Sequence, residues 1–388
     1  MANILSKQYK SVFSTPKEDK KVNNVGKFFE TTEDHFLHDI DITEEEILKT
    51  LKGLPNNSSA GPDGIPTRLL KELANDLTKP LLILFRHSLD TGSPLETPYK
   101  ATVTPIHKGG DKASPQKYRP VCLTSHIVKV LERILRKHIV DHLEQSNLMN
   151  KNQHGFRSKH STLSQLIAFY DQVINKLDKG STIDAIYIDF AKAFDTVDHG
   201  ILLHKIRHKA KIAGKIGVWI HNFLSKRVQQ VVVNGELSEE VLVTSGVPQG
   251  TVLGPVLFLI MIADIDNDVE SSHVSMYADD TRIMKQISKE SDEENLKYDL
   301  STIYDWCNEN NMKFNGDKFE LIVFTTKRNE FNEKDYKSPD GKKIEEKSNL
   351  KDLGIQLSGN LKFTEHIDTV ISKAQKMTGW ILCIFNTR

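Results

Sequence analysis

The stretch MYADDTRI, residues 276–283, places two adjacent carboxylates, Asp279 and Asp280, in a run that otherwise alternates like a β-strand. Aspartate is depleted in strands, and neighbouring carboxylates repel each other unless a positive charge lies close to them. One interpretation is a hairpin turn, where aspartate is common. The other is a metal site. The stretch alone leaves both interpretations open.

Composition narrows the class of protein. With 388 residues, of which 38% are hydrophobic and 27% charged, the chain is long enough for about two or three globular domains. The net charge is zero, but residues 100–137 hold nine Lys or Arg and two acids, and residues 201–227 hold seven and no acid. Such stretches are either solvated helix faces or surfaces for a polyanion such as nucleic acid.

The cysteines and the apolar runs bear on location. Cys122, Cys307 and Cys383 are far apart and lack zinc-ligand spacing, as in a reducing compartment. The N-terminus has no signal-peptide core, and the longest apolar run, residues 252–263, is too short to span a bilayer. We therefore expect a cytoplasmic or nuclear protein without a membrane partner.

Periodicity and turn residues predict mixed helices and strands. Helices are expected over 42–54, with Thr43 as N-cap, over 125–145 and over 294–311. Three more are expected: one that ends at about 179, one that begins near Thr196, and one that follows the loop at 245–250. Strands or hairpins are expected over 99–123, 182–190, 229–244 around Asn234-Gly235, 273–287 and 318–326. No regular βαβ order appears. We therefore predict an α+β fold with a mostly antiparallel sheet packed on helices.

The strand that ends at Asp189 gives the paired acids a chemical meaning. If this strand pairs with the hairpin that holds Asp279, carboxylates 90 residues apart in the sequence project from the same end of one sheet. Mg²⁺ binds a few carboxylates together with substrate phosphates. Two such ions about 4 Å apart support in-line displacement at phosphorus.

Further motifs occur in a fixed order along nearly the whole chain. They are SSAGPDGIP (58–66), PIHKGGD with YRPVCLTS (105–125), NQHGFR (152–157), YIDFAKAFDTVDH (187–199), SGVPQGTVLGPVLF (245–258), YADD (277–280), NGDKFELIVF (315–324) and LGIQL (353–357). Together they resemble the reverse transcriptases of non-LTR (LINE-type, Jockey-like) retrotransposons.

The resemblance implies a right-hand polymerase fold with fingers, a palm whose antiparallel sheet packs on helices, and a partial thumb. It divides the chain into an N-terminal extension and helical lead-in (1–75), fingers with part of the palm (76–180), the palm (181–345) and the end of the palm with a truncated thumb (346–388). The family's usual endonuclease domain is not expected here.

The resemblance also assigns the acids. Asp189 and Asp279 match the two metal-binding aspartates, for two Mg²⁺ ions with Mn²⁺ as the alternative. Asp280 matches the family's third acid, which is expected to bind one metal or to lie just outside its ligands. Lys318 matches the lysine that is thought to protonate the departing pyrophosphate. The competing interpretations are turn or cap roles for the aspartates and a plain surface position for Lys318.

Nucleotide-binding roles follow in the same way. Lys108 and Arg119 match the residues that hold the triphosphate, and Phe194 matches the bulky residue that excludes a 2′-hydroxyl. Gln249 matches the contact to sugar and base, and Phe190 is placed in the same group. Without the resemblance, Lys108 and Arg119 would be exposed basic residues and Gln249 a turn residue. Phe194 and Phe190 would be aromatic residues of the core.

Two further positions are assigned to nucleic acid. Tyr277 is expected against the primer's minor groove, with a core-facing tyrosine as the alternative, and Gly246, like Gly250, is expected to let backbone approach the substrate. The RNA template would be read by base pairing, with the basic stretches along the hybrid.

The implied function is RNA-directed DNA polymerase activity, which adds dNTPs to the 3′-hydroxyl of a DNA primer. Two alternatives stay open. An inactive nucleic-acid-binding remnant would fit a truncated thumb, and a metal-dependent nuclease would share the paired acids but would not need Phe194 or Gln249.

Overall fold

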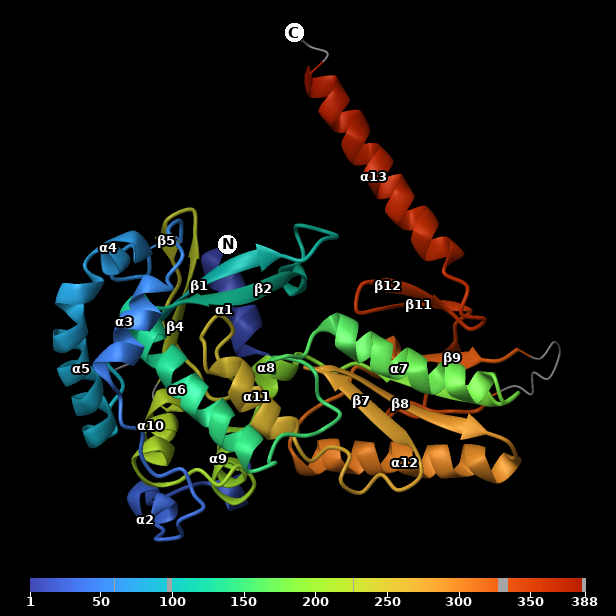
Figure 1. Ribbon diagram of the computed structural model, residues 1–388, viewed down its shortest axis with the longest axis horizontal. Coiled ribbons are helices and arrows are strands. Elements are labelled where there is room, and N and C mark those ends of the chain that lie inside the picture. The colour runs from blue at the N-terminus through green and yellow to red at the C-terminus, as the bar shows by residue number, and fades with distance from the viewer. Residues whose placement is uncertain (59, 96–99, 226, 327–333, 386–388) are drawn as a thin grey trace. The chain divides into compact units, whose positions relative to one another are not determined.

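The computed structural model describes residues 1–58, 60–95, 100–225, 227–326 and 334–385 (Figure 1). Ser59, Tyr99 and Lys226, which fall in predicted segments, lie outside these residues. The chain forms two compact units, each assembled from separate segments. Unit 1 comprises Met1–Asn150, Ala191–Asp264 and Cys307–Lys313, and unit 2 comprises Lys151–Phe190, Ile265–Trp306 and Phe314–Arg388. The predicted functional division at 75, 180 and 345 stays a prediction.

Unit 1 combines helices with a small mixed sheet. Its helices are α1 (Ala2–Lys10), α2 (Val25–Phe29), α3 (Glu44–Lys52), α4 (Thr67–Glu72), α5 (Ala74–Thr91), α6 (His126–Gln145), α8 (Ala193–Thr196), α9 (His199–His208), α10 (Gly214–Leu224) and α11 (Gly254–Ile262). Its strands are β1 (Lys100–His107), β2 (Tyr118–Leu123), β4 (Val228–Val233), β5 (Glu236–Leu237) and β6 (Val241–Leu242). β1 pairs antiparallel with β2 and parallel with β4.

Local signals in unit 1 form as predicted. The Thr43 hydroxyl accepts the backbone N–H of Glu46 and caps α3. Asn234 and Gly235 both have positive φ, the conformation that a tight two-residue hairpin between β4 and β5 requires. The apolar run at residues 252–263 forms the buried helix α11.

One helix boundary in unit 1 differs from the prediction. Helix α8 ends at Thr196, and α9 begins only at His199, because Asp198 leaves the helical path and caps the N–H of Ile201. The predicted helix start near Thr196 is therefore wrong by about one turn.

The second basic stretch, residues 201–227, is not a continuous exposed surface. Lys205 is buried and its ammonium lies 2.5 Å from the Asp264 carboxylate. Lys215 is exposed but pairs with acids at 2.6 and 2.9 Å, and Arg227 is buried. Lys205 and Arg227 are therefore not part of an exposed basic surface. For the exposed charges of this stretch, a position along nucleic acid stays a prediction.

Unit 2 is built on one five-stranded sheet with the order β10-β9-β3-β8-β7. The strands are β3 (Thr182–Ile188), β7 (His273–Tyr277), β8 (Asp280–Ile287), β9 (Glu320–Phe324) and β10 (Glu345–Glu346), with a separate hairpin of β11 (Asn349–Asp352) and β12 (Ile355–Ser358). All neighbours in the large sheet are antiparallel except β10 and β9. Its helices are α7 (Thr162–Leu177), α12 (Glu290–Glu309), whose last three residues belong to unit 1, and α13 (Thr364–Phe385).

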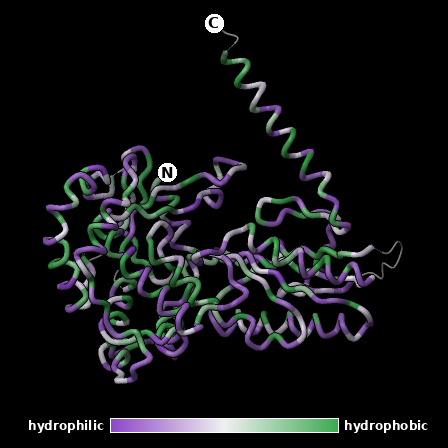
Figure 2. Tube along the Cα trace, viewed as in Figure 1, coloured by the Kyte–Doolittle hydropathy of each residue, from purple (hydrophilic) through white to green (hydrophobic). Residues whose placement is uncertain are grey.

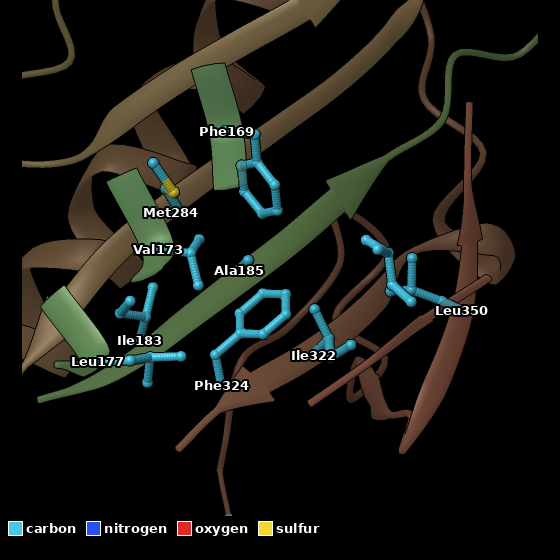
Figure 3. Close-up of a cluster of buried hydrophobic side chains, with 10 residues drawn as sticks. Phe169, Val173, Leu177, Ile183, Ala185, Met284, Ile322, Phe324 and Leu350 are labelled. Carbon is cyan, nitrogen blue, oxygen red and sulfur yellow. The ribbon is translucent and has the colours of Figure 1, made fainter. Parts of the chain in front are cut away.

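The hydrophobic core of unit 2 lies between α7 and the sheet (Figure 3). Phe169 and Val173 project from α7 onto Ala185 of β3 and Phe324 of β9. The rings of Phe169 and Phe324 meet edge to face, with centroids 5.8 Å apart. Figure 1 shows α12 across the opposite face of the sheet. The predicted packing of an antiparallel sheet on helices is thus confirmed.

Helix α13 differs from the other long helices because no residue along it is buried. Figure 2 shows hydrophobic residues distributed over its length, and Trp380 is 63% exposed. Among the described residues, no helix has both the length and the apolar content to cross a bilayer.

Core packing in unit 2 leads to a stability prediction. Phe324→Ala should lower the free energy of unfolding by about 3–5 kcal/mol, because it opens a cavity against Phe169. Ile167→Ala, at a 58% exposed position of α7, should change it by less than about 0.5 kcal/mol. Equilibrium urea unfolding measures both, and equal effects would contradict this account of the core.

Candidate active site

The pairing of β3 with β8 brings distant aspartates to one end of the unit 2 sheet. The antiparallel register places Ile188 opposite Thr281, and Tyr277 pairs with Asp280 across the β7–β8 turn. If this pairing is continued by one residue beyond Ile188, Asp189 lies opposite Asp280. The predicted convergence of the strand end and the hairpin is confirmed.

Alternation along the two strands places the acids above the core. Side chains two residues apart share a face of a strand. Tyr187 and Asp189 therefore follow Ala185 on the α7 face of β3, and Arg282 and Asp280 precede Met284 on the same face of β8. The face thus passes from apolar core, through Tyr187 and Arg282, to carboxylates at the strand ends.

Electrostatics at the carboxylate end are strongly negative. Asp280 is exposed at the surface, but desolvation by the atoms around its carboxyl, together with the charges of Asp279 and Asp189, raises its pKa to about 6. The ammonium of Lys318, which ends a short 3₁₀ turn, lies 2.9 Å from the Asp189 carboxylate. Lys318 is therefore more than a plain surface lysine, because it partly neutralises the cluster of acids.

A cavity of about 150 Å³ lies beside these acids within unit 2. Asp189, Asp280, Lys318 and Tyr277 all line it. Tyr277 thus borders the cavity and is only partly buried, unlike a tyrosine fully enclosed in the core. In the described part of the chain, no group of three or more His, Cys, Asp or Glu side chains is arranged to hold a metal ion.

A buried ion pair forms the floor of this cavity. The Arg282 guanidinium bonds to the carboxylate of Asp352, at the end of β11, which also accepts the Tyr187 hydroxyl at 3.1 Å. The guanidinium lies 3.9 Å from the centre of the Phe169 ring, and it donates to the Ser275 hydroxyl at 2.7 Å. This contact joins the β11–β12 hairpin to the sheet directly beneath the acids.

Comparison with known proteins places this arrangement in a family. Residues 106–357 match the family described as reverse transcriptase (RNA-dependent DNA polymerase). The chain belongs to the reverse transcriptase family. The match includes the strand ends that carry Asp189, Asp279 and Asp280.

Individual relatives identify the kind of reverse transcriptase. The chain is 29% identical to the probable RNA-directed DNA polymerase from transposon BS of Drosophila melanogaster, over 84% of this chain and 37% of that protein. It is 27% identical to the RNA-directed DNA polymerase from mobile element jockey of the same species, over 85% of this chain and 36% of that protein. The predicted resemblance to non-LTR retrotransposon reverse transcriptases is confirmed. The chain spans less than two fifths of the length of these two relatives.

In unit 1 the reverse transcriptase brings together Phe194 and Gln249, two of the predicted nucleotide-binding residues. The backbone N–H of Val247 donates to the Phe194 carbonyl at 2.8 Å, and the Phe194 ring stacks on Phe258 with centroids 4.4 Å apart. The Gln249 amide donates to the Asp195 carboxylate at 2.8 Å. Asp195 was not among the predicted site residues, although it lies in the motif that contains Phe194.

Asp195 is also the acid to which the predicted triphosphate contacts are electrostatically coupled. Burial raises the pKa of Asp195, whereas the Gln249 hydrogen bond and the charges of Lys192, Lys108 and Arg119 lower it. Lys108 and Arg119 are both exposed, at the end of β1 and the start of β2. The predicted basic residues and Gln249 therefore share one electrostatic environment in unit 1.

Three of the predicted site residues are closely packed against other parts of the protein. Gly246 and Gly250 have positive φ, and a Cβ on them would lie 2.8 Å from the Asp195 carbonyl oxygen and 2.6 Å from that of Cys122. A Cβ would thus meet protein backbone at both positions, and the approach to substrate predicted for Gly246 and Gly250 stays a prediction. Phe190 is 5% exposed and packs on Phe314, so its ring has little surface for a nucleotide.

The raised pKa of Asp280 leads to a prediction about stability. The folded state binds the Asp280 proton more tightly than the unfolded state does, so the ionised form costs stability above pH about 6. Without divalent metal, Asp280→Asn should raise the thermal midpoint at pH 7.5 by about 2 °C, and the gain should vanish below pH about 4.

Asp292 is the control for this experiment, because backbone N–H groups of Ser288 and Lys289 lower its pKa. Asp292→Asn should therefore lower the thermal midpoint at pH 7.5. Differential scanning fluorimetry across the pH range measures both variants. A shift of the same sign in the two would contradict the account of Asp280.

The buried pair of Arg282 and Asp352 leads to a further prediction. Arg282→Met or Asp352→Leu alone should cost about 3–5 kcal/mol of unfolding free energy, because each leaves its partner buried and uncompensated. The double variant should cost much less than the sum. Urea unfolding of the four proteins gives the coupling energy, and additive costs would show that the pair is not coupled.

Proposed function

We propose that this chain carries the RNA-directed DNA polymerase activity of a non-LTR retrotransposon, adding dNTPs to the 3′-hydroxyl of a DNA primer on an RNA template. The observation that carries the proposal is the β3–β8 register, which sets Asp189 opposite Asp280 in a chain of the reverse transcriptase family. A nuclease would also need paired acids, but not the linked Phe194 and Gln249 of unit 1.

The donor set of the site suits Mg²⁺, with Mn²⁺ as the alternative. Asp189, Asp279 and Asp280 offer hard carboxylate oxygens, and desolvation together with the charges of the other two acids raises the pKa of Asp280. Two or three carboxylates with no complete protein cage are typical of Mg²⁺ sites that take their other ligands from substrate phosphates. When bound, two such ions would neutralise charge on the attacking oxygen and on the leaving pyrophosphate.

The chain's own residues would position and neutralise the substrates. Lys318 already lies against Asp189, so its ammonium is near the acids, where it could donate a proton to the leaving group. Lys108 and Arg119 would hold the triphosphate, as a point charge and as a bidentate donor. Phe194, supported by Phe258, would limit the space for a ribose 2′-hydroxyl.

The coarser features of the chain fit the same proposal. We assign fingers to 76–180, palm to 181–345 and the start of a thumb to 346–388, after an N-terminal extension over 1–75. Tyr277 would face the primer at the edge of the cavity. RNA template, DNA primer and dNTPs would be the partners, and the cytoplasm or nucleus the place of action.

Primer extension on poly(rA)/oligo(dT) with Mg²⁺ tests the proposed function. Wild-type protein should incorporate dTTP, and Asp279→Asn should reduce incorporation by at least about a hundredfold because it removes a metal-binding carboxylate. Chelation of the metal should abolish incorporation.

Asp305→Asn is the control, because Asp305 lies on α12, across the face of the sheet opposite to α7. This variant should leave incorporation unchanged. Binding of the template without incorporation by wild-type protein would favour a non-catalytic remnant. Shortening of the primer would favour a nuclease.

A further inference from the structure

The two-residue turn that carries Asp279 has a conformation that its sequence does not favour. Ala278, between Tyr277 and Asp279, has a φ of +56°. Hairpin turns with this conformation usually have glycine at the first central position, because a Cβ is disfavoured there. Something outside the turn must therefore hold Ala278 in place.

Gln153, from the NQHGFR motif, makes that contact. Its Oε1 accepts the backbone N–H of Ala278 at 2.8 Å, and its Nε2 donates to the carbonyl of the same residue at 3.3 Å. The side chain is 3% exposed. One amide thus satisfies both backbone groups of the strained residue, and because the Ala278 N–H can only donate, the oxygen of the amide must face it.

The surrounding backbone is arranged to admit this side chain. His154 donates to the Met276 carbonyl, and Met276 donates to the Asn152 carbonyl, both at 3.0 Å, so residues 152–154 lie along β7. Gly155 also donates to Gln153 Oε1, at 2.6 Å. A Cβ on Gly155 would lie 2.3 Å from the Ala278 nitrogen, so only glycine permits this approach.

We propose that Gln153 is a positioning residue for the paired aspartates, acting through Ala278. Its amide fixes the left-handed backbone of Ala278, and this sets the directions in which Asp279 and Asp280 leave the turn. The inference rests on the proposed polymerase function for its kinetic consequences, but the contact itself is independent of that function. It also gives the NQHGFR motif a physical role within unit 2.

Two measurements on the full chain test the proposal. In Gln153→Ala, hydrogen–deuterium exchange of a peptide that covers residues 276–281 should accelerate, because the Ala278 N–H loses its acceptor. In primer extension, kcat should fall by about ten- to a hundredfold, with the KM for dTTP changed less than about threefold. Thermal unfolding reports whether the variant remains folded.

Ala278→Gly provides the decisive variant, because glycine adopts positive φ without support. Ala278→Gly alone should retain most activity. The double variant Gln153→Ala with Ala278→Gly should have a kcat at least about tenfold higher than that of Gln153→Ala alone. Gln172→Ala is the matched control, since Gln172 contacts His273 at the far end of β7. It should leave both exchange at 276–281 and kcat unchanged.

The outcomes separate this proposal from the proposed function. Unchanged exchange in Gln153→Ala would refute the contact, whether or not the protein polymerises. Faster exchange with unchanged kcat, or no recovery in the double variant, would refute the positioning role. Wild-type protein that fails to extend a primer would refute the proposed function and the kinetic part of this inference, and leave the exchange result as the test of the contact.

Discussion

The antiparallel pairing of β3 with β8 is the constraint on which the candidate active site depends. Because side chains alternate along a strand, one register decides both which residues enter the core and which acids meet at the strand ends. Ala185 and Met284 lie opposite each other in the core, and the same pairing leads outward to Asp189 and Asp280. Burial of apolar surface against α7 thus offsets the repulsion between the acids above it.

Sequence reasoning captured the features that depend on local pattern. Thr43 as a cap, the Asn234-Gly235 turn and the buried start of α11 each follow from neighbouring residues, and each is present in the structure. The convergence of Asp189 with the YADD hairpin could be stated only as a condition, because no local pattern in either strand decides which strands pair. The roles of these acids came from family resemblance and not from pattern alone.

Contacts between distant side chains could not be predicted in this way. Gln153 lies 125 residues from Ala278, Arg282 lies 70 from Asp352, and Gln249 lies 54 from Asp195. A polar residue gives no local sign of which partner will satisfy it once it is buried. The same limit explains why the sequence did not indicate that Lys205 is buried with Asp264.

The shared face of β3 and β8 also determines which mutations in the gene of such a reverse transcriptase are most damaging. A point substitution alters one side chain, whereas loss or gain of one residue within β8 moves every later side chain to the other face. Arg282 and Met284 would then exchange environments with their neighbours, and the buried pair with Asp352 would be broken. An in-frame loss or gain of one residue between Asp280 and Met284 is therefore expected to damage a gene copy at least as much as replacement of Arg282.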